Sequence, residues 1–316
     1  MSDLMKNIDA RTKLAGTNKL EILLFTLGTD QRTGRRETYG INVFKVREVM
    51  RVPEITHAPE MPANVEGMLS LRGALVPVVN LADYTGVVTD KKPEIMIVTE
   101  YNTRMQGFLV EAVDTILRLD WSAMKVPPEM VAAQMGGLVT AVTELKDGRI
   151  VMMIDVEKIL AETTHYDDES AFSGIRPVGG DRQYTMLFAD DSAIARKQIQ
   201  RTLQALGVQH VSANNGLQGW EELQRIAARC ELQGRKVKDD IQLILTDAEM
   251  PEMDGYVLTK NIKSDTRFAG IPVIMYSSLS SVNQHLGQAV GVDQYVSKLQ
   301  PQKLAEAITQ LLQNNS

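Results

Sequence analysis

The sequence predicts a mixed fold, in which an N-terminal all-β domain precedes a C-terminal α/β domain with a doubly wound (βα)5 sheet. Two observations predict it. With 316 residues, the chain is about twice as long as a typical single domain. Its apolar pattern changes from short β-rich runs to strands that alternate with amphipathic helices. We therefore expect domains at residues 18–164 and 184–316, joined by a linker at 165–183.

The first half carries short runs rich in apolar and β-branched residues, separated by Gly, Pro, Asn and Asp. This pattern favours a mostly antiparallel, barrel-like β domain. The predicted strands are Ile22–Leu27, Tyr39–Val46, Ala74–Val79, Ile95–Val98, Phe108–Leu119 and Ile150–Val156. Helical signals are few. Val43–Met50 fits a helix or a strand, and Val156–Glu162 predicts a helix of one or two turns.

The second half alternates apolar runs with amphipathic segments, which is the pattern of a parallel sheet with right-handed crossovers. The predicted strands are Thr185–Ala189, Val208–Ser212, Ile241–Thr246, Ile271–Tyr276 and Val292–Val296. The predicted helices are Ala193–Leu206, Gly216–Gln233, Gly255–Ser264, Ser281–Val290 and Pro301–Leu312. The second helix is expected to extend through Arg225–Lys238, where its basic residues indicate a solvated face.

Composition excludes several classes of protein. Lys plus Arg number 34 and Asp plus Glu 40, and this net charge of −6 argues against a broad nucleic-acid or anionic-lipid surface. Cys230 is the only cysteine, so neither an intrachain disulfide nor a cysteine zinc cluster is expected. The charged N-terminus lacks a signal peptide, and no apolar run reaches the roughly 18 residues of a membrane span. We expect a cytoplasmic protein without membrane insertion.

Polar residues directly follow the predicted strands of the second half. Asp190 and Asp191 come after the first strand, Asp247 after the third, Ser277 after the fourth and Lys298 after the fifth. Because the carboxyl ends of parallel strands meet at one edge of a sheet, these side chains should converge. Taken singly, Asp191 or Ser192 is more simply a helix cap and Asp247 a turn residue, but the joint order of the acids, the serine and the lysine favours a functional site.

The chemistry of this set suits phosphoryl transfer. Carboxylates are good ligands for Mg²⁺. A carboxylate is also a nucleophile toward phosphorus when nearby cations neutralise the phosphoryl oxygens, and Lys298 with a metal ion would supply that charge. The hydroxyl of Ser277 is placed to bind a phosphoryl oxygen and to move toward it, which converts a local charge change into a backbone change.

The stretches LFADDSAIARKQI, LILTDAEMPEMDGYVL, IPVIMYSS and GVDQYVSK resemble the receiver domain of two-component response regulators. The resemblance implies that a histidine kinase phosphorylates Asp247, and that Ser277 and Lys298 engage the phosphoryl group. It assigns a conformational switch to Ser277 and Tyr295. It places the Mg²⁺ ligands at three carboxylates and one backbone carbonyl, those of Asp190, Asp191, Asp247 and Glu249.

This half departs from the receiver pattern at one loop. Receivers usually have proline directly after the lysine, whereas here Lys298 is followed by Leu299 and Gln300, and Pro301 comes three positions after the lysine.

In the first half, YGINVFKVREVMRVPEI, VEGMLSLRGALVPVVNL and GFLVEAVDTILRL resemble the CheW family of bacterial chemotaxis coupling proteins. That family implies two SH3-like β-barrel subdomains that bridge chemoreceptors and the kinase CheA. It places Val46, Ile95 and Ile116 on a receptor-facing groove, and Gly67 and Arg72 in a signature turn. An ordinary core position is an equally good interpretation of the three apolar residues. For Arg72 a surface ion pair is the alternative, but an arginine held in a tight Leu-Arg-Gly turn favours a binding anchor.

Together the resemblances imply a non-enzymatic chemotaxis adaptor, located at chemoreceptor arrays, which couples methyl-accepting chemoreceptors to CheA and which CheA phosphorylates on Asp247. Another phosphorelay regulator without a role in chemotaxis is an alternative. A haloacid dehalogenase type phosphatase is a second, because LILTDAE loosely resembles its signature, although the upstream pair Asp190 and Asp191 argues against it. A transcriptional regulator would need an output domain, which is not expected after a fifth helix that ends close to Ser316.

Overall fold

The computed structural model describes residues 19–57, 61, 65–101, 104–128, 130, 135–163, 169–179, 182–277, 290–298 and 300–314. The chain divides into two compact units, one that takes in Leu20–Leu119 and Ala123–Tyr166 and one that takes in Asp167–Ser316. The division falls at the start of the linker predicted at residues 165–183, and the predicted domain bounds themselves stay a prediction. Among the described residues, no helix has the length and apolar character needed to cross a lipid bilayer.

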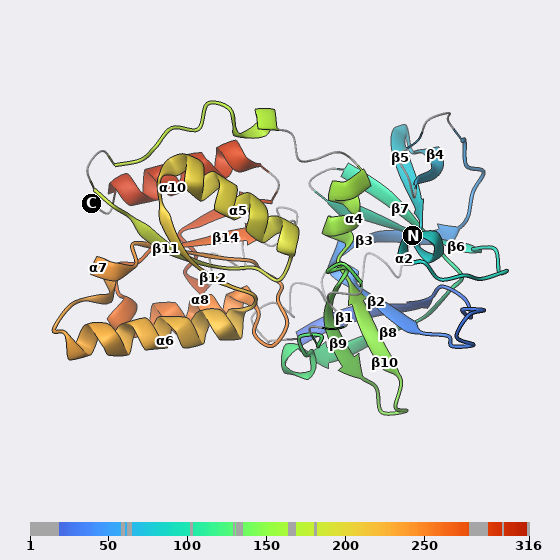
Figure 1. The fold of residues 1–316 in the computed structure, drawn as a ribbon, viewed down its shortest axis with the longest axis horizontal. Coiled ribbons are helices and arrows are strands. Elements are labelled where there is room, and N and C mark those ends of the chain that lie inside the picture. The colour runs from blue at the N-terminus through green and yellow to red at the C-terminus, as the bar shows by residue number, and fades with distance from the viewer. Residues whose placement is uncertain are drawn as a thin grey trace. The chain divides into compact units, whose positions relative to one another are not determined.

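The first unit is built from two five-stranded sheets (Figure 1). The first sheet has the order β8-β1-β2-β10-β9, in which β2 and β10 run parallel. Its strands are β1 (Lys19–Thr26), β2 (Thr38–Asn42), β8 (Ala112–Asp120), β9 (Val139–Glu144) and β10 (Ile150–Ile154). The second sheet has the order β3-β6-β7-β5-β4, in which β5 and β7 run parallel and the other pairs antiparallel. Its strands are β3 (Val46–Arg51), β4 (Val65–Leu71), β5 (Ala74–Asn80), β6 (Ile95–Tyr101) and β7 (Arg104–Val110).

Apolar side chains of this unit form a core that both sheets share. Phe25 and Tyr39 of the first sheet stack with ring centroids 5.9 Å apart and belong to the same buried cluster as Ile97 and Phe108 of the second. The helices are short, namely α2 (Leu81–Thr85) and α4 (Val156–Thr163). These observations confirm the predicted all-β class and the helix predicted at Val156–Glu162.

Several details of this half differ from the prediction. Val43–Met50 is neither one helix nor one strand, because the Asn42 side chain accepts the N–H of Phe44 at 3.0 Å and caps a 3-10 turn at Val43–Lys45 before β3 begins. Phe108–Leu119 is not one strand. It is interrupted at Glu111, whose N–H and carboxylate both bind Thr26, so that β7 and β8 enter different sheets. The strands β4 and β9 were not predicted.

The second unit contains one five-stranded sheet with the order β12-β11-β13-β14-β15, and every pairing is parallel. Its strands are β11 (Thr185–Ala189), β12 (Gln209–Ala213), β13 (Leu243–Thr246), β14 (Val273–Ser277) and β15 (Gln294–Ser297). Its helices are α5 (Ala193–Leu206), α6 (Gly216–Leu232), α7 (Val237–Asp240), α8 (Gly255–Ser264) and α10 (Pro301–Asn314). The predicted doubly wound sheet is confirmed, whereas the helix predicted at Ser281–Val290 lies, apart from Val290, outside the described residues.

The helices cover both faces of this sheet (Figure 1). On one face α5 and α10 pack through Leu203 and Ile308, and on the other α6 and α8 pack through Leu223 and Leu258. This arrangement follows from apolar residues at helical spacing, which give each helix one buried side. The strand ends are left uncovered by the helices, and the carboxyl ends carry the predicted site.

The second helix does not extend as predicted. α6 ends at Leu232, and Gly234 with φ +64° turns the chain before α7 begins at Val237. A glycine adopts this left-handed conformation without the steric cost that other residues incur, so it ends the helix. The continuous basic segment Arg225–Lys238 is therefore two helices with a turn between them.

Candidate functional site

The carboxyl ends of the sheet bring the predicted residues together. Asp190 directly follows β11, Asp247 directly follows β13, Ser277 ends β14 and Lys298 directly follows β15. The Asp247 N–H donates to the carbonyl oxygen of Ala189 at 2.8 Å, which continues the β11–β13 ladder to the site. The register of a parallel sheet thus places residues up to 108 positions apart in sequence on one edge.

Lys298 lies between two carboxylates. Its Nζ atom is 2.9 Å from Oδ2 of Asp190 and 2.9 Å from Oδ2 of Asp247. Lys298 and Asp190 have no exposed surface, and Asp247 is 4% exposed. Burial strengthens the attraction between these charges and makes loss of one partner costly. The ammonium is therefore fixed beside the predicted phosphoacceptor.

Three carboxylates form a cluster that suits a hard cation. One oxygen each of Asp190, Asp191 and Asp247 lie within 4.8 Å of one another, and Asp191 is only partly buried. An all-oxygen set of this kind is what Mg²⁺ prefers, and the partial exposure of Asp191 leaves the cluster open to solvent. Glu249 lies two residues after Asp247 in the same loop, and the role of its carbonyl as a ligand stays a prediction.

The Asp247 loop is held by backbone contacts. Oδ1 of Asp247 accepts the N–H of Ala248 at 2.6 Å, and the hydroxyl of Thr246 donates to the carbonyl oxygen of Asp247 at 2.9 Å. A Cβ atom at Gly255 would lie only 1.8 Å from that carbonyl oxygen. Only glycine therefore lets the start of α8 approach the loop so closely. Sequence reasoning missed this role, although Gly255 directly follows Asp254, the cap of α8.

The loop that carries the acidic pair is fixed by its own side chains. Oδ1 of Asp190 accepts the N–H of Ser192 at 2.9 Å, and Oγ of Ser192 caps α5 by accepting the N–H of Ala195 at 3.4 Å. The capping role, which the sequence left open between Asp191 and Ser192, thus falls to Ser192. Arg196, which sequence reasoning did not single out, donates from Nη1 to the carbonyl oxygens of both Asp190 and Asp191.

The two residues of the predicted switch lie on the neighbouring strands β14 and β15, where Ser277 pairs with Ser297 and Tyr295 with Met275. The backbone N–H of Lys298 donates to the carbonyl oxygen of Ser277 at 3.1 Å, and the hydroxyls of Tyr295 and Tyr256 are 3.5 Å apart. Burial raises the pKa of Tyr295, and hydrogen bonds with Tyr256 and Ser277 oppose that rise.

Pro301, the proline that comes three positions after Lys298, is the first residue of α10. Proline suits this position because the first residue of a helix needs no N–H donor.

The apolar residues predicted for partner binding do not share one environment. Val46 is buried in the core that both sheets share, and Ile95 packs against that core. Ile116 is in β8 of the other sheet and is 47% exposed. Ile116 is therefore the one of these three that offers apolar surface to a partner, and the partner-binding role of all three stays a prediction.

The two turn residues of the first half have distinct surroundings. A Cβ atom at Gly67 would lie 2.6 Å from the carbonyl oxygen of Thr56, so glycine permits a close approach of two backbones. Arg72 sits at the tip of the β4–β5 hairpin with φ +51° and pairs with Glu48 of β3 at 2.9 Å. The surface ion pair considered for Arg72 is present, and its role as an anchor stays a prediction.

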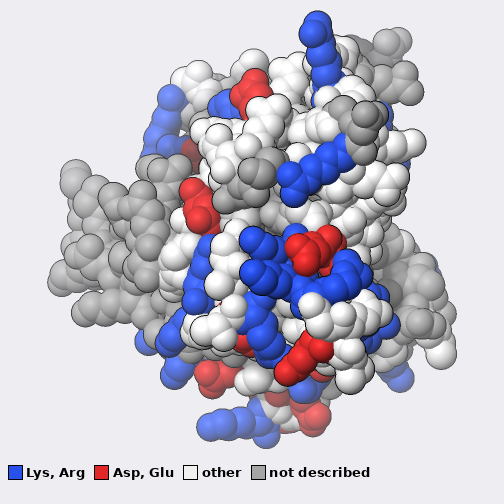
Figure 2. Space-filling model, turned by 90° about the vertical axis from the view of Figure 1, so that its left-hand side faces the viewer, with Lys and Arg blue, Asp and Glu red and all other residues white. Residues whose placement is uncertain are grey.

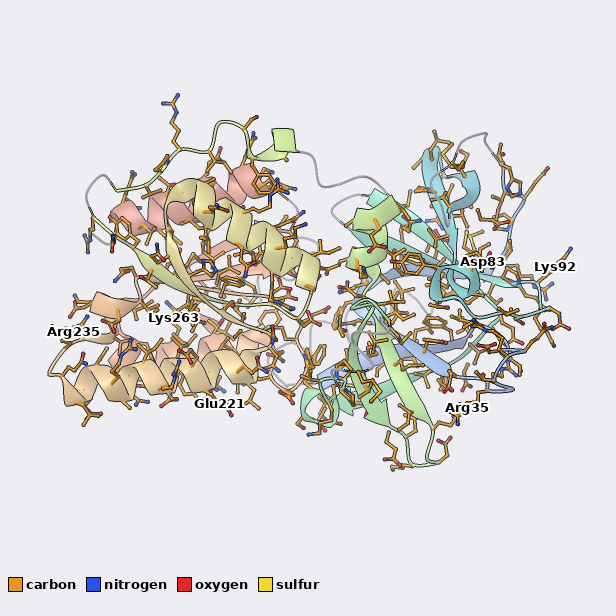
Figure 3. All side chains as sticks on the ribbon, in the orientation of Figure 1. Arg35, Asp83, Lys92, Glu221, Arg235 and Lys263 are labelled. Carbon is orange, nitrogen blue, oxygen red and sulfur yellow. The ribbon has the colours of Figure 1, made fainter. Side chains whose placement is uncertain are left out.

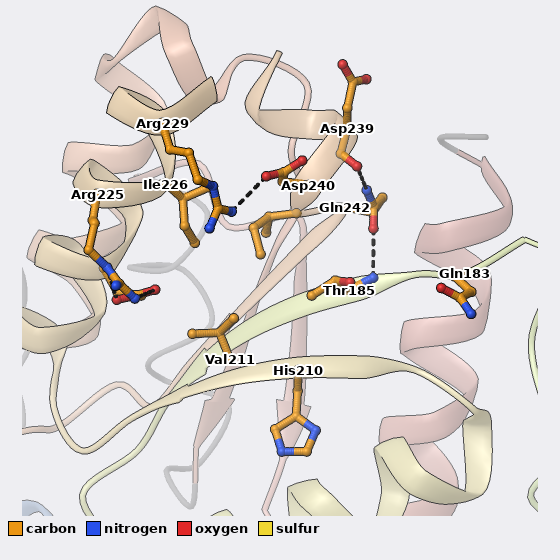
Figure 4. A pocket seen from close by; sticks show the side chains of 12 residues that line it. Gln183, Thr185, His210, Val211, Arg225, Ile226, Arg229, Asp239, Asp240 and Gln242 are labelled. Atoms are coloured by element: carbon orange, nitrogen blue, oxygen red, sulfur yellow. Dashed lines mark hydrogen bonds and ion pairs between the residues drawn. The ribbon is translucent and has the colours of Figure 1, made fainter. Parts of the chain in front are cut away.

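Basic side chains gather at the end of the receiver-like unit that holds α7 (Figures 2 and 3). A cavity of about 610 Å³ opens there beside α6 (Figure 4). Its two arginines are paired within the protein, Arg225 with Glu222 at 2.6 Å and Arg229 with Asp240 at 2.8 Å. The arginines are 75% and 57% exposed, and their acids 21% and 12%. The exposed arginines of this face are thus solvated, as the sequence indicates, and each of the two is paired with an acid of the same unit.

Comparisons with known proteins match each half of the chain to a family. Residues 21–164 match the CheW-like domain, and residues 186–309 match the response regulator receiver domain. Chemotaxis protein CheV3 of Helicobacter pylori is 28% identical over 306 residues, which cover 95% of this chain and 96% of the relative. Chemotaxis protein CheV1 of the same organism is 27% identical over 99% of both chains. Chemotaxis protein CheW of Klebsiella aerogenes is 29% identical over 50% of this chain and 92% of its own length. The chain thus joins a CheW-like domain to a response regulator receiver domain, the arrangement over which the chemotaxis proteins named CheV match nearly its full length.

Proposed function

We propose that this protein is a chemotaxis coupling adaptor whose CheW-like domain docks on chemoreceptors and on the histidine kinase CheA, and whose receiver accepts a phosphoryl group on Asp247. The observation that carries the proposal is the buried Asp247 carboxylate, which lies 2.9 Å from the Lys298 ammonium within the acidic cluster. The match to both domain families over most of the chain supports the adaptor role.

The site supports a simple phosphoryl transfer. A carboxylate oxygen of Asp247 forms a bond to phosphorus while the P–N bond of a phosphohistidine breaks, and the imidazole leaves with its electron pair and takes up a proton. Lys298 neutralises a phosphoryl oxygen at the place where charge gathers. Asp190, Asp191, Asp247 and the carbonyl of Glu249 would hold Mg²⁺, which supplies further neutralisation when bound.

The switch follows from the change in charge. The phosphoryl group adds a charge of about −1.5 to −2 next to Lys298 and Ser277. The hydroxyl of Ser277 then donates to a phosphoryl oxygen, and its movement alters the space beside Tyr295, whose hydroxyl contacts Tyr256. The modified receiver in turn changes how strongly the CheW-like domain couples its partners.

The docking residues proposed for the CheW-like domain are Val46, Gly67, Arg72, Ile95 and Ile116. The exposed side chain of Ile116 and the hairpin tip that carries Arg72 support a partner surface. Chemoreceptors and CheA are the proposed partners, at the receptor arrays. The net charge of −6 supports neither a nucleic-acid partner nor binding to anionic lipid.

The test is transfer of a labelled phosphoryl group from phosphorylated CheA to the full chain with Mg²⁺. The wild-type chain should acquire an acid-stable, base-labile label, and Asp247→Asn should not. Asp239→Asn is the matched control, because Asp239 is an exposed carboxylate in α7, remote in the fold from the carboxyl ends of the strands. Undiminished label on Asp247→Asn refutes the site. Sustained hydrolysis of a generic phosphomonoester would instead favour the phosphatase alternative, which the family matches do not favour.

A further inference from the structure

Arg196 lies one turn into α5 and contacts the loop that carries two of the proposed metal ligands. Its Nη1 atom donates to the carbonyl oxygen of Asp190 at 2.9 Å and to that of Asp191 at 2.8 Å. The first carbonyl belongs to the peptide group that joins Asp190 to Asp191, and the second to the group that joins Asp191 to Ser192. Because a peptide group is planar, one guanidinium fixes both peptide planes of the connection between β11 and α5.

The Asp191 carboxylate is at the centre of this arrangement. Its Cα atom is shared by the two peptide planes that Arg196 binds, so rotation of either plane swings the Cα–Cβ bond. The Asp191 carboxylate also belongs to the cluster in which one oxygen of each acid lies within 4.8 Å of the others. The orientation of the loop therefore decides whether Asp191 reaches the other two acids.

We propose that Arg196 is a positioning residue for the metal site, which holds the Asp190–Asp191 loop in the conformation that binds Mg²⁺. The inference rests on the proposed function, in which these carboxylates bind the ion. Arg196 acts through backbone oxygens and does not touch the ion. Partners that orient metal ligands in this way typically change metal affinity by about 10–100-fold when they are removed.

If Arg196 acted only through its charge, its removal would change Mg²⁺ affinity in the opposite direction, and this difference makes the proposal testable. A guanidinium near three carboxylates repels an incoming cation, so a purely electrostatic role predicts that its removal strengthens Mg²⁺ binding. The same role predicts no change for Arg196→Lys, which keeps the charge. A positioning role predicts weaker binding for both changes. Methionine has no donor, and the lysine side chain is one atom shorter than that of arginine, so its ammonium does not replace the Nη1 atom that bridges the two carbonyl oxygens.

The experiment is calorimetric titration of the full chain with Mg²⁺. We expect Arg196→Lys and Arg196→Met to weaken binding by about tenfold. Lys197→Met is the matched control, because it removes an exposed positive charge at the next position and keeps both Arg196 hydrogen bonds. This control should not weaken binding. Wild-type affinity in Arg196→Lys, or tighter binding in Arg196→Met, overturns the proposal.

A second measurement separates this inference from the proposed function. Hydrogen exchange at the Ser192 amide, which donates to Oδ1 of Asp190, reports the loop in the metal-free chain. Exchange should be faster in Arg196→Lys than in the wild type or in Lys197→Met, and unchanged exchange overturns the positioning role. If the wild-type chain binds no Mg²⁺, the proposed metal site is wrong and the inference falls with it. If the wild type binds Mg²⁺ and Arg196→Lys binds it equally well, only the inference is wrong.

Discussion

One ion-pair site in the receiver and one ion pair in the CheW-like domain lie in opposite environments. In the receiver, Lys298 is enclosed with Asp190 and Asp247, and each of its two contacts with them is 2.9 Å. In the CheW-like domain, the Arg72–Glu48 pair has the same separation of 2.9 Å, but the Arg72 side chain is 68% exposed. Equal distances thus have different consequences, because water screens the second pair and hardly reaches the first.

Removal of each cation should give the largest difference between the two regions. Lys298→Met leaves two buried carboxylates without their cation, and we expect the free energy of unfolding of the receiver to fall by about 3–5 kcal/mol at neutral pH. Arg72→Met should cost about 0–1 kcal/mol. Urea unfolding of the full chain, read at amides of each domain by hydrogen exchange, measures both. If Lys298→Met and Arg72→Met lost the same free energy of unfolding, the predicted difference between the buried and the exposed ion pair would be wrong.

Asp254 adds a buried carboxylate to the comparison, because its side chain caps α8 and is only 3% exposed. Burial raises its pKa to about 6 from an ordinary 3.8, against hydrogen bonds from the N–H groups of Val257 and Tyr256. The folded receiver binds this proton more tightly than the unfolded chain. The Asp254 contribution to the free energy of unfolding is therefore full below pH 4 and falls as the pH rises toward 6, by about 3 kcal/mol in all.

Asp254→Asn should therefore stabilise the receiver at pH 7 and approach the wild type below pH 4. Its amide keeps an oxygen that can cap α8. Asp265→Asn is the matched control, because Asp265 also caps a helical turn but Arg267 lowers its pKa. The stabilising contribution of Asp265 is present above its ordinary pKa and is lost as the pH falls, so the control should have the opposite sign. Urea unfolding as a function of pH checks both, and a profile of Asp254→Asn parallel to that of the wild type would refute this assignment.

One glycine in each domain allows two backbone segments to approach closely, and the two positions can be compared. A Cβ atom at Gly255 would lie 1.8 Å from the carbonyl oxygen of Asp247, and one at Gly67 would lie 2.6 Å from that of Thr56. We expect each alanine variant to lose about 1–3 kcal/mol of stability. Only Gly255→Ala should also slow phosphorylation of Asp247, because it displaces the loop that carries the carboxylate. The rate of label transfer from phosphorylated CheA distinguishes the two variants. Equal slowing by Gly67→Ala would contradict the prediction that only Gly255 affects the Asp247 loop.

The sequence predicted that the polar side chains of the receiver converge, because they stand at or directly after the ends of its strands. Asp190, Asp247 and Lys298 needed only the rule that parallel strands share one carboxyl edge. Arg196 and Gly255 were not predictable in this way, because they act on backbone carbonyl oxygens, whose directions no residue pattern encodes. In the CheW-like domain, strand pairing joins distant segments and Glu111 divides one apolar run between two sheets. Burial of Val46 and exposure of Ile116 follow from that pairing and not from residue type.

The smallest expected effect on stability is at Ile116, on the surface of the CheW-like domain. A change there distinguishes a residue that docks on a partner from one that packs in the core. Ile116→Ser alters an exposed side chain and should change the free energy of unfolding by less than about 0.5 kcal/mol. Val46→Ala removes buried methyl groups and should cost about 1–3 kcal/mol. If Ile116 docks on receptors, Ile116→Ser lowers co-sedimentation with receptor arrays while leaving stability intact. Val46→Ala should lower co-sedimentation only to the extent that it unfolds the domain. Normal co-sedimentation of Ile116→Ser would show that the docking surface lies elsewhere in the domain. Val46 and Ile95 lie against the core and offer a partner less apolar area.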